Sequence, residues 1–147
     1  MIRPFRRRRP DFAAGLRELA EFAGEVGGGR IGAQVVTPEA VYVPLVAADG
    51  ERYLLRIAIS PERYLAAPPS CRFVGHDRKP ARDAWPAPDP RGPFRSPDFI
   101  CTSPIAEYHR VHPEHPYRPG DGSLVNTVAA VFVALHGPGY SGRWRGR

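Results

Sequence analysis

The chain has 147 residues, of which 42% are hydrophobic, and it carries a formal net charge of +6 at pH 7. This length suits one domain that buries its own core without disulfides or metal. No apolar run approaches the roughly 20 residues of a membrane-spanning helix, and the basic start lacks the apolar region of a secretory signal. We therefore expect a soluble cytoplasmic protein whose two cysteines are free thiols.

Arginines gather at both ends of the chain. Residues 1–10 hold Arg3 and Arg6 to Arg9, and residues 141–147 hold Arg143, Arg145 and Arg147. We expect two solvated basic tails flanking one domain at residues 11–140. The alternative is a nucleic-acid-binding module. It is the weaker reading, because the tails offer few aromatic residues on which bases would stack.

The first element expected is an amphipathic helix. Asp11 can cap it, with Pro10 just before, and apolar residues then recur at helical spacing from Phe12 to Val26. The glycines at 27–29 end this pattern.

Strand patterns follow the first helix. Residues 30–37, 40–47 and 52–60 are rich in β-branched or alternating apolar residues, and Asp49-Gly50 suits a hairpin turn. A short fourth strand, Ser70 to Val74, is expected after the Pro68-Pro69 pair. Together these segments predict an antiparallel meander.

The remainder predicts a long loop and a second helix. Residues 76–98 are rich in proline and lack periodicity, so we expect an irregular loop that Trp85 and Phe94 pin to the core. Residues 123–135 are apolar on most sides and suit a helix buried against a sheet, capped by Asp121 or Ser123. The predicted fold class is α+β: a helix, four strands, a long loop and a crossing helix.

This order resembles the ubiquitin-conjugating enzymes, over residues 11 to 137. In that family a third strand leads through a Tyr-Pro-x-x-Pro-Pro turn into a fourth strand, a long loop, an Ile-Cys-Leu segment with the active cysteine, and a Trp-x-Pro before the crossing helix. The matching residues of this chain are Tyr64, Pro68-Pro69, Ile100-Cys101-Thr102 and Tyr117-Arg118-Pro119.

The resemblance implies a divergent bacterial relative that acts as a thioester carrier. Cys101 would accept a ubiquitin-like protein from a ThiF-like activating enzyme and pass it to an amine. A deconjugating metalloprotease would be a further partner. No cofactor is expected, because the activating enzyme uses the ATP. The alternative is a non-catalytic module of the same fold that only binds a ubiquitin-like partner.

The segment around Cys101 departs from the family pattern. The His-Pro-Asn motif that normally precedes the cysteine is missing, and an insertion carries His109, His112 and His115 at three-residue spacing. Without the asparagine, the oxyanion needs another donor: a backbone N–H near Cys101, the hydroxyl of Thr102 or Ser103, or a histidine. Of the three histidines, His109 is the expected helper of the cysteine, with a surface or packing histidine as the alternative.

Two other interpretations concern the cysteines. Pro97 and Pro104 flank Cys101 and favour an exposed thiol, whereas Cys71 lies inside a strand pattern and is expected to be buried. The histidines and Cys101 also offer four ligands of a type that zinc accepts. However, Pro113 and Pro116 interrupt any helical face, so no metal site is expected.

Overall fold

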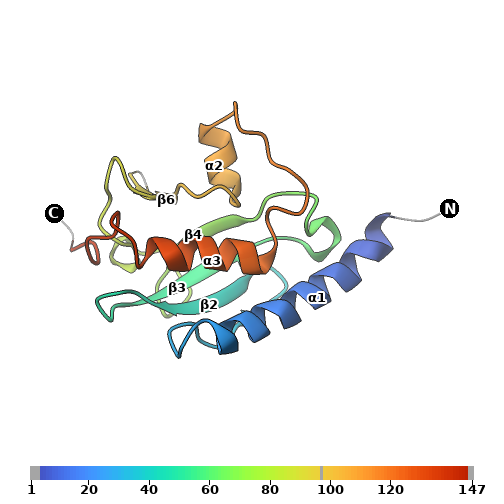
Figure 1. The fold of residues 1–147 in the computed structure, drawn as a ribbon, viewed down its shortest axis with the longest axis horizontal. Helices are drawn as coiled ribbons and strands as arrows, with labels where there is room; N and C mark the ends of the chain where they lie inside the picture. The colour runs from blue at the N-terminus through green and yellow to red at the C-terminus, as the bar shows by residue number, and fades with distance from the viewer. Residues whose placement is uncertain (1–3, 97, 146–147) are drawn as a thin grey trace.

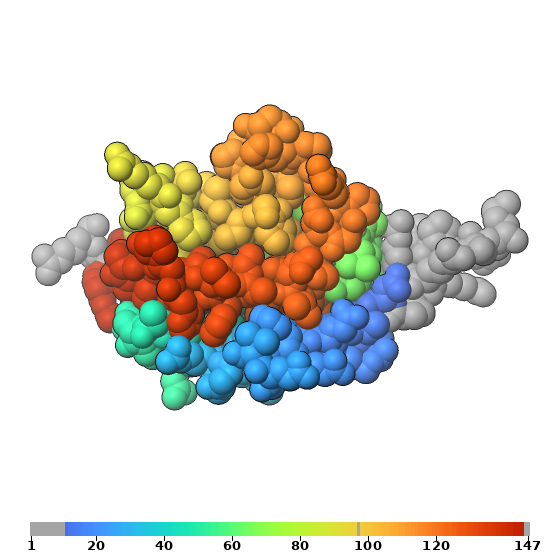
Figure 2. All heavy atoms as spheres, viewed as in Figure 1, coloured from blue at the N-terminus to red at the C-terminus, as the bar shows by residue number. Residues whose placement is uncertain are grey.

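The computed structural model describes residues 4–96 and 98–145, with side chains from residue 11 onward (Figures 1 and 2). Its elements, in chain order, are α1 (Pro4–Glu25), β1 (Val35–Val36), β2 (Val41–Val46), β3 (Arg52–Ala58), the 3-10 turn η1 (Pro61–Arg63), β4 (Ser70–Val74), the 3-10 turn η2 (Arg82–Ala84), β5 (Phe94–Arg95), β6 (Phe99–Ile100), α2 (Ala106–Val111) and α3 (Leu124–Ala134). This set of helices and strands confirms the predicted mixed α+β class.

Helix α1 is longer than the sequence pattern predicts. The expected start was Asp11, but the helix is already formed at Pro4 and runs through Pro10. Arginine is a good helix former, so the arginine run continues the helix instead of forming a frayed tail, and residues 4–10 are a correction to that prediction. Residues 1–3 lie outside the described part. Beyond the helix, Gly28 and Gly29 adopt φ of 58° and 82°, the left-handed backbone that glycine accepts most easily.

The four predicted strands form one antiparallel sheet in the order β1-β2-β3-β4. Strand β1 is shorter than residues 30–37. Ile31 and Gly32 also pair with β2. Between the Ile31–Leu45 and Val35–Tyr42 pairs, residues 32–34 stand against residues 43–44, and this bulge of one residue interrupts the ladder. Within it, the Gln34 side chain donates to the Leu16 carbonyl of α1 at 2.8 Å. The meander is therefore confirmed, with its first strand split.

Helix α3 crosses one face of the sheet, and α1 lies beside it (Figure 1). The inner face of the sheet contributes Val43, Leu55 and Phe73, and α3 contributes Val128 and Val131, all with no exposed surface. Ser123 caps α3 by accepting from the Asn126 N–H at 3.0 Å, one of the two predicted capping residues. The predicted crossing helix is thus confirmed.

The proline-rich segment 76–98 holds two aromatic anchors, as predicted. Phe73 packs against Trp85 and Phe94 with ring centroids 5.3 and 5.8 Å apart, and both anchors are buried. Two features were not predicted: the short β5–β6 hairpin, whose first strand lies inside the expected irregular loop, and α2 after it. Helix α2 ends at Val111, two residues before Pro113, so the proline stops the helix and does not prevent it.

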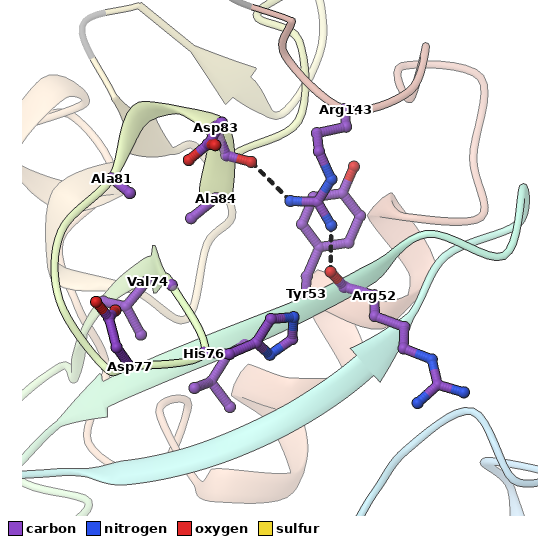
Figure 3. Close-up of a pocket in the computed structure, with 11 residues that line it drawn as sticks. Arg52, Tyr53, Val74, His76, Asp77, Ala81, Asp83, Ala84 and Arg143 are labelled. Atoms are coloured by element: carbon purple, nitrogen blue, oxygen red, sulfur yellow. Dashed lines mark hydrogen bonds between the residues drawn. The ribbon is translucent and has the colours of Figure 1, made fainter.

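The C-terminal segment is docked on the domain, which corrects the expected solvated tail for residues 141–145. Arg143 donates to the Glu51 carboxylate at 3.3 Å and to the backbone carbonyls of Arg52 and Asp83. Its guanidinium also lies 4.4 Å from the ring centre of Tyr53. Figure 3 shows Arg143 reaching across a hollow at the ends of β3 and β4. Because its donors are satisfied by the protein, we do not read this hollow as an anion site.

Within the described residues, no helix combines the length and the apolar character needed to cross a membrane.

Candidate functional site

Cys101 lies directly after β6, at the rim of the core. Strand β6 is fixed by the pairing of Ile100 with Phe94, and both of these side chains are buried. The Cys101 N–H donates to the Pro93 carbonyl at 2.6 Å, so the backbone of the cysteine is held. Its side chain is half-buried and carries a free thiol. The thiol is therefore fixed in place yet still reachable from solvent, which a nucleophilic cysteine requires.

Helix α2 stands over β4 and β6 (Figure 1) and brings one histidine to the cysteine. The helix starts where the Ala106 N–H donates to the Pro69 carbonyl at 2.8 Å. His112 caps its end, and the His112 Nε2 atom lies 3.5 Å from the Cys101 Sγ atom. On the other side of the ring, Nδ1 is 4.0 Å from a carboxylate oxygen of Glu114. A thiol beside an imidazole is the arrangement that activates cysteine nucleophiles.

The structure brings His112, and not the expected His109, to Cys101. His109 Nδ1 donates to the His115 carbonyl at 2.6 Å, because a carbonyl only accepts. The His109 ring also packs edge-on against Tyr117, while His115 Nδ1 bonds the Tyr108 hydroxyl at 2.8 Å. His109 and His115 thus fix the loop after α2. The equal sequence spacing hid this difference, because the chain leaves the helix at His112 and turns that residue back toward the cysteine.

Among the predicted oxyanion donors, Thr102 keeps a free hydroxyl. The Cys101 N–H is occupied by Pro93, and Ser103 is exposed. The Thr102 Oγ1 atom and the His109 Nε2 atom are both buried and have no hydrogen-bond partner, which is rare for buried polar groups. Thr102 follows the nucleophile directly, so it is the best-placed candidate of this group.

Cys71 is buried, as predicted. Its exposed fraction is 3%, and its N–H donates to the Glu107 carboxylate at 3.2 Å. Burial, with a smaller contribution from the charge of Glu107, raises the pKa of the Cys71 thiol well above its usual value. A thiol in this setting stays protonated and unreactive near neutral pH.

Two tyrosines connect the segment before β4 to the start of α3. The Tyr64 hydroxyl accepts from the Leu124 N–H at 2.8 Å. The Tyr117 hydroxyl donates to the Leu65 carbonyl at 2.9 Å and accepts from the Gly122 N–H at 3.1 Å. These residues belong to the sequence landmarks identified above, and their hydroxyls set where the crossing helix begins.

Within residues 4–96 and 98–145, no three His, Cys, Asp or Glu side chains converge on a point where they could hold a metal ion. Comparison with protein-family models, with curated proteins and with solved structures finds no significant match to this chain.

Proposed function

We propose that the chain is an acyl carrier of the ubiquitin-conjugating type, with Cys101 as the thioester nucleophile and His112 as its base. The observation that carries the proposal is the 3.5 Å contact between Cys101 Sγ and His112 Nε2. It supplies the activated thiol that the resemblance in chain order calls for. The order of helix, antiparallel meander, cysteine segment and crossing helix supports the same function.

The chemistry consists of two thiol–acyl steps. His112 takes the Cys101 proton, and the thiolate attacks the carbonyl carbon of an incoming thioester. The C–S bond to the donor thiol breaks, the protonated His112 gives its proton to the departing thiolate, and the acyl group remains on Cys101. An amine then attacks the new thioester and loses a proton to His112, an amide forms, and Cys101 is released as thiolate. The Thr102 hydroxyl would donate to the oxyanion in both steps.

A small probe tests the first step without the cognate partners. The protein is mixed at pH 7.5 with an acetylated peptide that ends in Gly-Gly and carries its C-terminus as the thioester of mercaptoethanesulfonate. Intact mass should increase by one acyl group, and dithiothreitol should remove it. Cys101→Ala should abolish the adduct, and Cys71→Ala, the matched control, should retain it.

The second step is tested by isolating the adduct and adding butylamine. The carrier function predicts loss of the acyl group from Cys101 with formation of the butylamide, faster in the wild type than in His112→Ala. If folded wild-type protein forms no adduct on Cys101, or if the adduct never passes to the amine, the proposal is wrong. The non-catalytic alternative then stands, and it predicts binding of a ubiquitin-like protein that Cys101→Ala leaves unchanged.

A further inference from the structure

The outer face of the sheet carries arginines where the inner face carries the core. Side chains alternate between the two faces of a strand, so Leu55 and Phe73 point inward and Arg56 and Arg72 point outward. The register places Arg56 opposite Arg72 on one side and opposite Tyr42 on the other. Tyr42, Arg56 and Arg72 therefore form one row across three adjacent strands.

The pairing of Arg56 with Arg72 costs stability unless something neutralises it. Like charges directly opposite in an antiparallel pair repel each other, and among the described residues neither guanidinium forms an ion pair. The two acids that line the same groove as Arg72 are engaged elsewhere. Asp98 lies 3.9 Å from Arg82, and Glu107 accepts from the Ser70 hydroxyl and from the backbone of β4.

A third guanidinium completes the row. The Arg78 guanidinium lies 4.8 Å from the ring centre of Tyr42, and Arg78 adopts φ of 67°, a left-handed conformation that is uncommon for residues other than glycine. Its turn is closed by the Gly75 N–H bond to the Lys79 carbonyl at 2.9 Å. The only acid of that turn, Asp77, is held by the Lys79 N–H at 3.0 Å. The turn thus places a further positive charge over β2.

We propose that this outer-face row, made of Arg56, Arg72 and Arg78, binds the phosphate backbone of a nucleic acid without reading its bases. Guanidinium groups bind phosphate through paired N–H donors. The net charge of +6 favours a polyanion.

The apolar side chains of this face argue against a protein partner. Tyr42 and Val74 are buried, with 8% and 3% of their surface exposed, and Val35, opposite Tyr42 on the edge strand, is 42% exposed. One exposed valine at the edge of the sheet does not make the desolvated apolar core of a protein interface. Because Tyr42 lies beneath Arg78, no aromatic ring of this row is free to stack on bases. Recognition would therefore be electrostatic and independent of sequence. The inference does not depend on the proposed carrier function.

Fluorescence anisotropy with labelled 20-base oligothymidylate and a labelled 20-base-pair duplex tests the proposal. The wild type should bind both probes, with an affinity that falls steeply between 50 and 200 mM salt. Arg56→Gln/Arg72→Gln should weaken binding at least tenfold at 50 mM salt. It should also reduce the slope of log K against log salt by about 1.4 for the single strand or about 1.8 for the duplex. Arg17→Gln/Arg30→Gln removes the same charge from exposed positions elsewhere and should change binding much less.

Three results would overturn the proposal. The first is that the wild type binds neither probe at 50 mM salt. The second is that the control variant weakens binding as much as the row variant. The third is that a labelled 20-residue polyglutamate binds more tightly than both nucleic acids and loses affinity in the row variant. The last result would point to an acidic protein partner. Thermal unfolding provides the folding check, because relief of the Arg56–Arg72 repulsion should leave the melting temperature of the variant equal to or above that of the wild type.

Discussion

Replacing Tyr64 by phenylalanine isolates one hydrogen bond that joins the segment before β4 to the crossing helix. Tyr64 is 2% exposed, and its ring meets Phe12 of α1 edge-on at 5.4 Å. Phenylalanine preserves that packing but removes the acceptor of the Leu124 N–H. The backbone group would then be buried without a partner, because the first N–H groups of a helix have none inside the helix.

The size of the expected loss in stability follows from the burial of this hydrogen bond. Leaving a buried donor unsatisfied costs about 1–3 kcal/mol. With an unfolding entropy of roughly 2.1 cal/mol/K per residue, a chain of 147 residues has about 0.3 kcal/mol/K. The expected fall in melting temperature is therefore about 3–10 °C.

Urea unfolding followed by circular dichroism measures the change in the free energy of unfolding. An unaltered m-value would show that the native and denatured states keep their compactness. Tyr108→Phe is the matched control, because it removes a hydroxyl whose bond to His115 is exposed. It should cost less than about 0.5 kcal/mol. If Tyr64→Phe were no less stable than Tyr108→Phe, the reasoning about the buried N–H would be refuted.

Two further substitutions test neighbouring parts of the argument. In Gly15→Ala, the new Cβ atom would lie 2.3 Å from the Tyr64 hydroxyl oxygen. Unfolding should therefore show a loss of about 1–3 kcal/mol, although alanine is normally the better helix residue, and a gain in stability would contradict the packing. In His112→Ala, Cys101 should react about threefold more slowly with iodoacetamide at pH 7. The substitution removes the imidazole that lies 3.5 Å from the Cys101 Sγ atom and can take its proton. If His112→Ala reacted as fast as the wild type, or if His115→Ala were slowed equally, His112 would not be the base for Cys101.

The hydrophobic periodicity of the sequence was enough to predict the helices and strands that bury only one face. The alternation in β2 and β3 and the apolar stripes of the two long helices follow directly from packing against a single core, so the sheet order and the crossing helix were predictable. The burial of Trp85 and Phe94 followed from their being the large aromatic residues of a polar, proline-rich segment.

Features held by single long-range bonds were not predictable. The docking of Arg143 depends on acceptors more than 50 residues away in sequence, and no local pattern reveals it. The choice of His112 over His109 depends on where α2 ends and how the chain turns afterwards. The Gln34 side chain, in the interruption after Gly32, bonds the Leu16 carbonyl 18 residues earlier, and the alternation of the strand does not reveal this bond.

The docked C-terminal segment has a consequence for the order of folding during synthesis. The Trp144 N–H bonds the Trp85 carbonyl, and the Ala87 N–H bonds the Gly142 carbonyl, so the proline-rich loop is paired with a segment that is synthesised more than 50 residues later. Tyr140 also joins the aromatic contacts of Tyr53 and Phe94. Domains usually fold as units as the chain emerges, but here the sheet lacks the cover of α3 and of this segment until residues 124–145 have left the ribosome. A ribosome pause before that point would leave the inner face of the sheet open to chaperones.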